Sequence, residues 1–309
     1  MKEIKIHKFD SWSPYDGFAE GSGRSEKIWL ESPSGKIGLF KFPKSGQEVG
    51  TCTSEHVSEH LAYNLGRILG VPIATVDIGT YEGRIGCMSY QINENHEELI
   101  EAALFITEHH SQYNMEDMID YETGKYYCLE HVFEIASTKE MRYRVIQMMV
   151  FDFLIGNSDR HQNNWAIIRK YSTRKHEIFP LRISPLYDNG SSLCCYVNEN
   201  IVSECLGKDK NRFRALVDSK SRSMIRIDGY KKNRPTHMEM VKYLFENYPE
   251  TSIVFREFLD KLNHDTVDKL VDLYDGLVSQ NKIKLIKMFL HWKMDTLSVF
   301  LKDGGKSEY

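Results

Sequence analysis

One stretch of the sequence, residues 151–190, constrains the fold more than any other. A nearly all-apolar segment, residues 145–155, leads into it and is followed at once by polar residues that include Asp159 and Asn164. An apolar run of this kind with polar residues directly after it is typical of a buried helix that ends in a projecting loop. We therefore expect Asp159 and Asn164 to lie on a loop held by a core helix.

The second half of this stretch predicts a β-hairpin. Two apolar segments, residues 165–169 and 178–183, flank the turn-prone residues 172–175. Such an arrangement is the sequence signature of two antiparallel strands joined by a turn. The hairpin would bring Asp188 back beside Asn164.

These three polar side chains suit phosphoryl transfer. That reaction needs one carboxylate to orient the attacking hydroxyl, and an amide with a second carboxylate to hold Mg²⁺ on the nucleotide phosphates. In protein kinases an Asn follows the catalytic Asp by five positions, and a further Asp comes later in the chain. Here Asn164 lies five positions after Asp159, and Asp188 opens the sequence Asp188-Asn189-Gly190. The alternative is a loop rich in hydrogen-bonding residues followed by a simple turn.

At this point the sequence resembles a known family. The motif G-N-S-D-R-H-x-x-N at residues 156–164, followed by S-P-L-Y-D-N-G at residues 184–190, is similar to the HipA-like serine/threonine kinases, and among them to the compact CtkA-type members. The D-R-H-x-x-N part also resembles, more distantly, phosphatidylinositol 3-kinase-like and 4-kinase-like enzymes. The resemblance implies an α+β, two-lobed protein-kinase-like fold. Its β-rich N-lobe would comprise residues 1–92 and its helical C-lobe residues 93–309.

A loop of small residues, Gly21-Ser22-Gly23, lies ahead of an expected strand at residues 28–30. Small residues let backbone N–H groups approach phosphate oxygens closely, so this loop is a candidate cover for the ATP phosphates. A plain hairpin turn fits the same residues.

Lys41 lies among apolar neighbours in the next expected strand, residues 36–42. An unpaired ammonium would be costly there, whereas a nucleotide phosphate and an acidic partner would compensate for the burial. The alternative is an edge lysine exposed to water. A helix expected at residues 53–69 offers Glu55 and Glu59 as the acidic partner, and the pattern of the family favours Glu59.

The same helix contains a competing motif. His56, Glu59 and His60 read as H-x-x-E-H, a zinc signature in which both histidines share one helix face. A zinc hydrolase would also need a third protein ligand, and we identify none in the sequence. The zinc hydrolase is therefore kept only as an alternative.

The remaining elements are expected from periodicity. Two strands at residues 73–81 and 84–92 would complete the N-lobe, and the end of the second, including Met88 and Tyr90, would form the hinge whose backbone groups bind adenine. The other expectations are as follows: helical or loop-like structure at residues 94–122 and 126–137, irregular structure at 191–226, and helices at 236–247, 252–262, 266–279 and 283–301.

The formal net charge of −4 gives no global indication of nucleic-acid binding. The stretch from residue 208 to residue 234 is nevertheless strongly basic. Four of its residues recur at every second position, which on a strand or extended loop would place them on one side; they are Lys208, Lys210, Arg212 and Arg214. We predict that these four hold an acidic or phosphate-bearing acceptor. A solvated surface is the alternative.

The six cysteines show no C-x-x-C spacing, and the first residues contain no apolar signal-peptide core. No segment is apolar enough for a membrane span. We therefore expect a cytoplasmic protein, and secretion of an effector by a specialised route is also compatible with the sequence.

The resemblance implies an ATP- and Mg²⁺-dependent serine/threonine protein kinase that also phosphorylates itself. Asp159 would orient the acceptor hydroxyl, Asn164 and Asp188 would bind Mg²⁺, and Lys41 would contact the phosphates and pair with Glu59. His161 would brace the loop, and Arg160 would either brace it or contact phosphate. The partners would be a protein carrying a Ser or Thr acceptor and an antitoxin-like or regulatory protein. The alternatives are a lipid or small-molecule kinase on the same residues and a nucleotide-binding pseudokinase.

Overall fold

The computed structural model describes residues 3–17, 26–45, 53–171 and 179–304. The chain forms two compact units, and each is assembled from three segments of the sequence. Unit 1 comprises residues 1–91, 187–214 and 262–292; unit 2 comprises residues 92–186, 215–261 and 293–309.

Unit 1 is built on a six-stranded sheet with the strand order β1-β5-β6-β4-β3-β2. The strands are β1 (His7–Lys8), β2 (Ser13–Pro14), β3 (Lys27–Glu31), β4 (Ile37–Lys41), β5 (Val76–Tyr81) and β6 (Arg84–Tyr90). The expected strands at residues 28–30, 36–42, 73–81 and 84–92 are therefore confirmed, with shifts at their ends. The turn between β5 and β6 consists of Glu82 and Gly83, both at positive φ (51° and 73°), as a tight two-residue hairpin requires.

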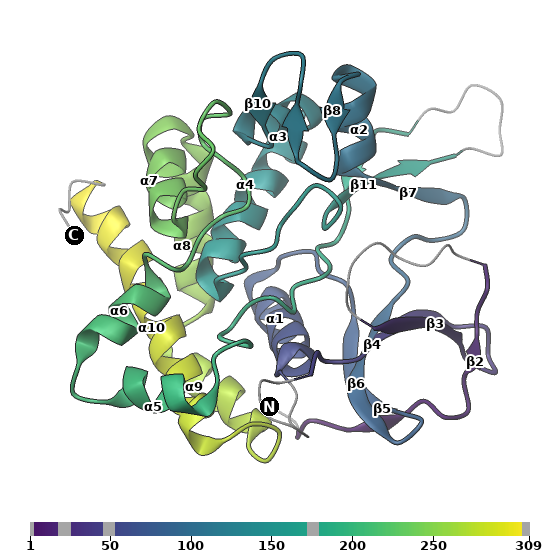
Figure 1. The fold of residues 1–309 in the computed structure, drawn as a ribbon, viewed down its shortest axis with the longest axis vertical. Coiled ribbons are helices and arrows are strands. Elements are labelled where there is room, and N and C mark those ends of the chain that lie inside the picture. Colours follow the sequence, from purple (N-terminus) through teal and green to yellow (C-terminus); the bar gives the residue numbers. More distant parts are fainter. Residues whose placement is uncertain (1–2, 18–25, 46–52, 172–178, 305–309) are drawn as a thin grey trace. The chain divides into compact units, whose positions relative to one another are not determined.

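Large apolar side chains form the core on one side of this sheet. They are Phe9, Leu30, Phe40, Phe42, Tyr81, Met88 and Tyr90. Helix α1 (Glu55–Leu69) packs against β5 and β6, as Figure 1 shows, because Val57, Leu61 and Leu65 recur at helical spacing and are all buried. It ends at Gly70, whose φ of 74° is the left-handed conformation that favours glycine. The predicted helix at residues 53–69 is confirmed.

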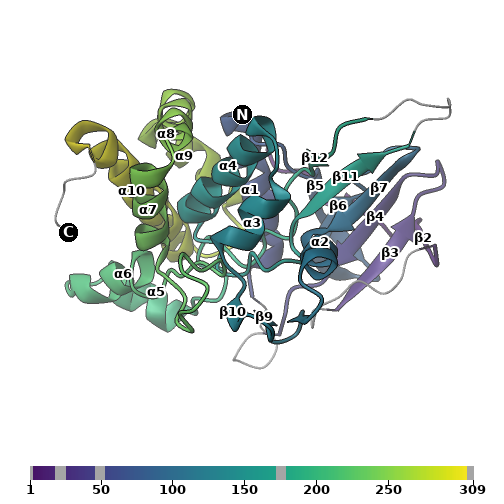
Figure 2. The same ribbon diagram turned by 90° about the horizontal axis from the view of Figure 1, so that it is seen from above.

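Unit 2 is organised around α4 (Lys139–Ile155), whose side chains from Val145 to Ile155 are all buried. Three helices pack against it, and Figure 2 shows α7 and α8 along its side. They are α3 (Leu129–Ile135), α7 (His237–Asn247) and α8 (Glu250–Lys261). A helix that is apolar on every side must be surrounded in this way, so the prediction of a buried core helix is confirmed.

The hairpin expected before Asp188 is present. β11 (Ala166–Lys170) pairs antiparallel with β12 (Arg182–Ile183), with Ile167 opposite Ile183; residues 172–178 lie outside the described residues. On its other edge β11 pairs with β7 (Glu97–Glu101). The expectation of helix or loop at residues 94–122 misses this strand. The rest of that region contains α2 (Ala102–His109), β8 (Tyr113–Asn114) and β9 (Ile119–Asp120), followed by β10 (Lys125–Tyr126).

The expectation of irregular structure at residues 191–226 is wrong. The region contains α5 (Glu199–Leu206) and α6 (Lys210–Val217). Because a helix turns about 100° per residue, Lys210 and Arg212 point to nearly opposite sides. The predicted alignment of Lys208, Lys210, Arg212 and Arg214 on one side is therefore also wrong, and Arg212 is instead paired with Glu204 of α5 at 2.7 Å.

The C-terminal helices follow the predictions closely. α7, α8 and α10 (Gln280–Asp303) confirm three of the four expected helices. The fourth is shorter than expected, since α9 (His264–Val271) passes into a 3-10 turn (Asp272–Tyr274). Within the described ranges, no helix combines the length and the apolar character needed to cross a bilayer.

Candidate active site

The loop after α4 begins with a sharp stop of the helix. Gly156 adopts φ 66°, and its N–H group bonds to the carbonyl oxygens of the last helical turn. The N–H group of Asn157 then bonds to the carbonyl oxygen of Asp152 at 2.9 Å. This left-handed ending turns the chain away from the helix, so the polar residues that follow leave the core as a loop.

A buried ion pair holds this loop to the helix. Arg160 donates from Nε and Nη2 to the two carboxylate oxygens of Asp152, at 3.0 and 2.8 Å. Arg160 and Asp152 are 1% and 4% exposed, and Asn157 adds a third bond to the same carboxylate. A bidentate pair of this kind is directional as well as strong, so it fixes where the loop starts.

The same guanidinium reaches the far end of the loop. Nη1 of Arg160 donates to the carbonyl oxygen of Asn164 at 2.7 Å. Arg160 is therefore a brace, which decides between the two roles considered for it. His161 has a smaller bracing part, because its Nδ1 accepts the N–H of Asn163 at 3.2 Å.

A bond to the backbone of Asp159 orients the Asn164 side chain, and Asn157 holds the backbone of Asp159 in turn. Nδ2 of Asn164 donates to the carbonyl oxygen of Asp159 at 2.8 Å, so the amide oxygen Oδ1 is the part of this side chain left to accept or ligate. The N–H of Asp159 donates to Oδ1 of Asn157 at 3.1 Å. The loop thus presents a carboxylate and an amide oxygen from one rigid turn.

Sequence reasoning missed two members of this arrangement, Asp152 and Asn157. A signal for Asp152 is present in the sequence, because it is an acidic residue inside an otherwise apolar helix and therefore needs a buried cationic partner.

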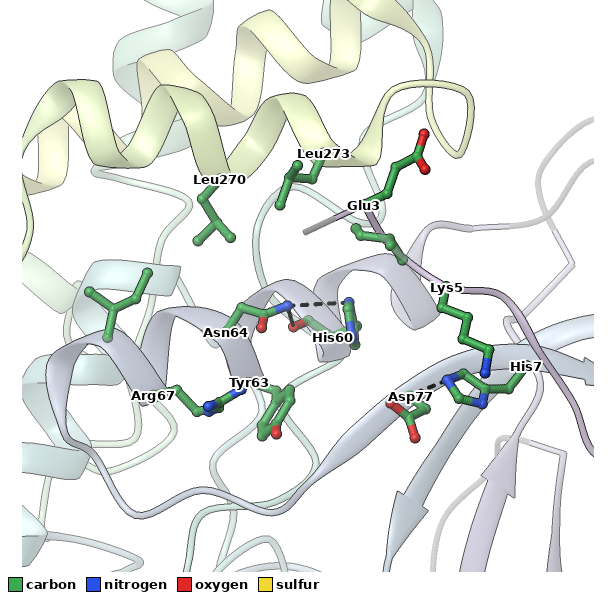
Figure 3. Close-up of a pocket in the computed structure, with 12 residues that line it drawn as sticks. Glu3, Lys5, His7, His60, Tyr63, Asn64, Arg67, Asp77, Leu270 and Leu273 are labelled. Atoms are coloured by element: carbon green, nitrogen blue, oxygen red, sulfur yellow. Dashed lines mark hydrogen bonds and ion pairs between the residues drawn. The ribbon is translucent and has the colours of Figure 1, made fainter. Parts of the chain in front are cut away.

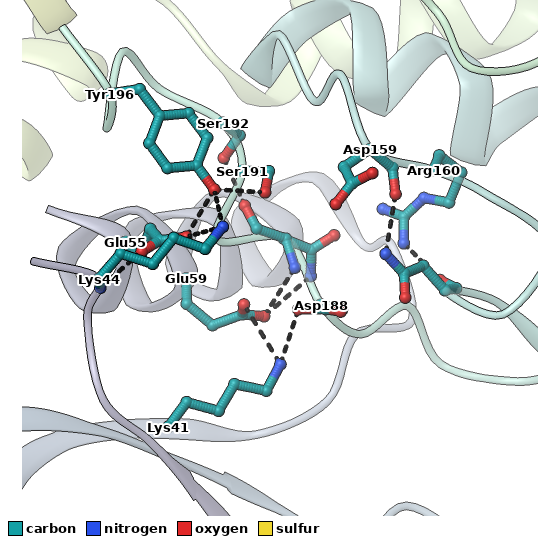
Figure 4. A network of polar contacts seen from close by, with 12 residues as sticks. Lys41, Lys44, Glu55, Glu59, Asp159, Arg160, Asp188, Ser191, Ser192 and Tyr196 are labelled. Carbon is teal, nitrogen blue, oxygen red and sulfur yellow. Dashed lines mark hydrogen bonds and ion pairs between the residues drawn. The ribbon is translucent and has the colours of Figure 1, made fainter. Parts of the chain in front are cut away.

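In unit 1, the ammonium of Lys41 reaches the carboxylates of both Glu59 and Asp188 (Figure 4). Its Nζ is 2.9 Å from Oδ1 of Asp188 and 3.8 Å from Oε2 of Glu59. Burial by itself lowers the pKa of Lys41, but Asp188 and Glu59 outweigh it and raise the pKa. Lys41 is therefore a fixed positive charge in a protected site, which is what binding of a phosphate requires.

The segment Asp188-Asn189-Gly190 is tied to α1 through Glu59. The N–H of Asn189 donates to Oε1 of Glu59 at 2.9 Å. A side chain at Gly190 would place its Cβ about 3.2 Å from Oε2 of Glu59, closer than most contacts of a real Cβ. Asp188 itself has φ 57°, a conformation that is uncommon outside glycine and that clusters at functional sites.

Glu55 is engaged elsewhere. It accepts from the backbone N–H of Lys44 at 3.0 Å and from the hydroxyl of Tyr196 at 2.5 Å, and Nζ of Lys44 lies 3.2 Å away. Of the two glutamates considered as partners for Lys41, the structure thus brings Glu59 to it and pairs Glu55 with Lys44.

The residues of the zinc motif have other contacts. Nδ1 of His60 lies 2.9 Å from the hydroxyl of Tyr274, and Figure 3 shows His60 and Asn64 on the wall of a cavity of about 550 Å³. His56 is buried, and burial lowers the pKa of both histidines to about 4. Throughout the part of the chain that the structure describes, no group of three or more His, Cys, Asp or Glu side chains could hold a metal ion.

Met88 and Tyr90 are placed in the sheet rather than at a free strand end. Met88 pairs with Phe40 on one side and with Asp77 on the other, and its side chain is fully buried. The N–H of Tyr90 bonds to the carbonyl oxygen of Thr75. The backbone of this strand is therefore engaged in sheet pairing up to Gln91, whose N–H bonds to the carbonyl oxygen of Ile37, and the adenine contact of the strand end stays a prediction. The predicted phosphate loop, Gly21, Ser22 and Gly23, lies outside the described residues.

The chain belongs to the HipA-like C-terminal domain family, whose model matches residues 20–248. It is similar to the serine/threonine-protein kinase CtkA of Helicobacter pylori (strain J99), with 23% identity over 304 residues that cover 92% of this chain and 82% of CtkA.

Two solved structures show the same fold. One is the proinflammatory kinase CtkA of Helicobacter pylori, with a TM-score of 0.78, 17% identity, and coverage of 99% of this chain and 100% of that chain. The other is HipA of Shewanella oneidensis MR-1, solved with HipB and operator DNA, with a TM-score of 0.55, 12% identity, and coverage of 96% and 69%. The predicted kinase-like α+β fold and the resemblance to HipA-like, CtkA-type proteins are confirmed.

Proposed function

We propose that this protein is an ATP-dependent kinase that transfers the γ-phosphoryl group to a Ser or Thr hydroxyl of a protein. The observation that carries the proposal is the Lys41 cluster: a protected ammonium beside Glu59 of α1 and beside Asp188 of the segment after the hairpin. A strand lysine, a helix glutamate and a metal-binding aspartate are the parts that protein kinases use to hold the phosphates.

The donor groups fit Mg²⁺–ATP. Mg²⁺ prefers oxygen ligands, and Asp188 offers a carboxylate while Asn164 offers the amide oxygen left by its bond to Asp159. When bound, ATP would supply the phosphoryl group, and Mg²⁺ would supply positive charge next to the phosphates. Lys41 binds those phosphates, and Glu59 keeps Lys41 in position. The loop Gly21-Ser22-Gly23 is proposed to cover them.

Asp159 is the proposed catalytic carboxylate. It accepts a hydrogen bond from the acceptor hydroxyl and holds that oxygen ready for attack. Because Arg160 and Asn157 fix the backbone on either side, little loop reorganisation is needed when the acceptor arrives. Prior positioning of the reacting groups accounts for a large part of the rate enhancement by enzymes.

Incubation with Mg²⁺ and γ-labelled ATP tests the proposal, with protein, lipid and small-molecule acceptors in parallel and autophosphorylation followed in the same reactions. Label on a serine or threonine of protein supports it, and label on a lipid or small molecule alone would show a different kinase on the same residues. Asp159→Asn should keep the fold and nucleotide binding while transfer falls about a hundredfold or more. Nucleotide binding without transfer to any acceptor would instead indicate a pseudokinase.

A partner protein is proposed as well, since the HipA relative was solved with HipB. Co-purification of this chain with the product of a neighbouring gene, followed by assay of the complex, tests it. A partner that leaves the rate of transfer unchanged would not be a regulator.

A further inference from the structure

A cavity of about 490 Å³ in unit 2 has more cationic than anionic side chains in its lining. Five of its residues are basic: Arg222, Arg226, Lys231, Arg234 and Lys242. Three acidic residues also line it, namely Asp228, Glu239 and Glu246. Most of these basic residues lie in the second half of the basic stretch, residues 208–234. None of them is among the four basic residues that the sequence analysis named as anion-binding.

The arginines of this cavity are positioned by backbone oxygens. Nη1 of Arg222 donates to the carbonyl oxygen of Arg234 at 2.6 Å, and Nε of Arg226 donates to that of Lys232 at 3.1 Å. The guanidinium of Arg226 also lies 4.5 Å from the centre of the Tyr126 ring. These contacts orient the groups but bring no negative charge to them.

The buried charge of Arg226 has no carboxylate partner among the described residues. It is only 8% exposed, and its Nη1 has no hydrogen-bond partner among the residues that the structure describes. Burial lowers the pKa of Arg226, and the nearby charge of Arg234 lowers it further. A buried guanidinium without an anion is destabilising, so a bound anion would stabilise this part of the fold.

Two of the three acidic residues of the cavity are engaged by backbone groups. Glu239 accepts the N–H of Thr236 at the start of α7, at 2.6 Å, and Asp228 accepts the N–H of Tyr230 at 3.0 Å. Within the described part of the chain, neither carboxylate forms an ion pair with the arginines. The acidic residues of the cavity therefore do not neutralise all of its basic residues, and an excess of positive charge remains.

The cavity adjoins the catalytic loop of the same unit. Nη1 of Arg234 lies 3.4 Å from the carbonyl oxygen of Ser158, the residue directly before Asp159. The cavity also shares Ile227 and Tyr243 with a second cavity of about 540 Å³. The lining of that cavity includes the aromatic Phe133 and Tyr248, the acidic Glu130 and Glu134, and one basic residue, Arg142.

We propose that the Arg222–Arg226–Arg234 cavity binds the phosphate monoester of a phosphorylated residue in the acceptor polypeptide. The inference rests on the proposed kinase function, because it places an already phosphorylated segment of the acceptor beside Asp159. A dianionic phosphate neutralises more of the excess charge than a carboxylate does, and its oxygens match the forked donors of arginine.

A peptide is the occupant that both cavities fit together. Two hollows with a common wall suit an extended chain that places successive side chains in separate pockets. The aromatic and acidic second cavity would take an apolar or basic residue of the same peptide. A lipid headgroup would use the first cavity and leave the second without a function.

Binding of a fluorescent alanine-rich peptide with one phosphoserine and one unmodified serine tests this proposal in the absence of ATP. Matched peptides carry glutamate or serine in place of the phosphoserine. Arg222→Gln, and separately the exposed pair Lys231→Gln with Lys242→Gln, should each weaken binding of the phosphopeptide about tenfold or more. Arg256→Gln is the matched control, because it removes an exposed arginine of α8 in the same unit and should leave binding unchanged.

The binding should also weaken as salt is raised, since Debye screening acts over about 8 Å at physiological ionic strength. Equal affinity for the phosphoserine and glutamate peptides would overturn the phosphate assignment. An equal loss in Arg256→Gln would overturn the site, and so would binding only to vesicles that contain a phosphoinositide. Because no nucleotide is present, phosphopeptide binding without any kinase activity would refute the proposed function and leave the phosphate site standing.

Discussion

The buried pair Asp152–Arg160 makes a sharp prediction about the loop that carries Asp159. In Asp152→Asn the charge of Arg160 remains buried at 1% exposure without the carboxylate that it contacts at 2.8 and 3.0 Å. Removing one partner of a buried ion pair costs about 3–5 kcal/mol. At about 2–4 °C per kcal/mol for a domain of this size, the melting temperature should fall by about 6–20 °C.

The matched control is an ion pair of similar length at the surface. Asp265 and Lys269 lie 2.6 Å apart, with side chains that are 70% and 65% exposed, and such pairs contribute about 0–1 kcal/mol. Asp265→Asn should therefore shift the melting temperature by only a few degrees. Urea denaturation of both variants beside the parent measures the difference.

A second variant separates stability from loop geometry. Replacing the pair by apolar residues, Asp152→Leu with Arg160→Met, should restore most of the stability because no charge is left buried. Transfer should stay low, since the bond from Arg160 to the carbonyl oxygen of Asn164 is lost. Loss of less than about 1 kcal/mol in Asp152→Asn, or full activity in the double variant, would refute this reasoning.

Three further predictions concern the metal, the pH dependence of stability and the zinc motif. Asp188→Ala should reduce the thermal stabilisation by Mg²⁺–ATP, because a ligand stabilises only the state that binds it; an undiminished shift would exclude it as a metal ligand. Burial lowers the pKa of His237 to about 3, below its unfolded value of about 6.5. Between these two pKa values the unfolded state therefore binds more protons than the folded state does. The free energy of unfolding should fall by about 1.4 kcal/mol per pH unit below pH 6.5. His237→Gln should flatten that slope and the exposed His109→Gln should not; an unchanged slope in His237→Gln would contradict it. The double variant His56→Gln with His60→Gln should leave phosphoryl transfer and metal content unchanged. If the parent contains stoichiometric zinc and this variant loses it, the zinc hydrolase alternative would be supported.

The parts of the candidate site that lie on strong periodic elements could be predicted from the sequence. β4 alternates up to Lys41, and α1 keeps its apolar residues at helical spacing, so the strand and the helix that hold Lys41 and Glu59 follow from local pattern. The five-residue spacing from Asp159 to Asn164 is also local. These residues could be named without any knowledge of their contacts.

Elements that depend on distant partners could not be predicted in this way. β7 has the sequence EELIE, and three of its five residues are acidic, which disfavours a strand. It is a strand because β11 pairs with it along five residues. Arg160 and Asp152 are only eight positions apart, but their pairing depends on the helix stop at Gly156, which sets the course of the chain after α4.

The basic stretch, residues 208–234, is a second case in which tertiary contacts decide what the sequence could not predict, and here they matter for function. Residues 208–234 look alike in composition, but their environments differ by burial. Arg214 is exposed on α6, whereas Arg226 is buried beside Arg234 in unit 2. A solvated arginine has water as its partner and demands nothing else of the fold, while a buried one needs an anion or a backbone oxygen. Charge counted along the sequence therefore predicts an anionic ligand, and only burial distinguishes the arginines that bind it from those that keep the surface hydrated.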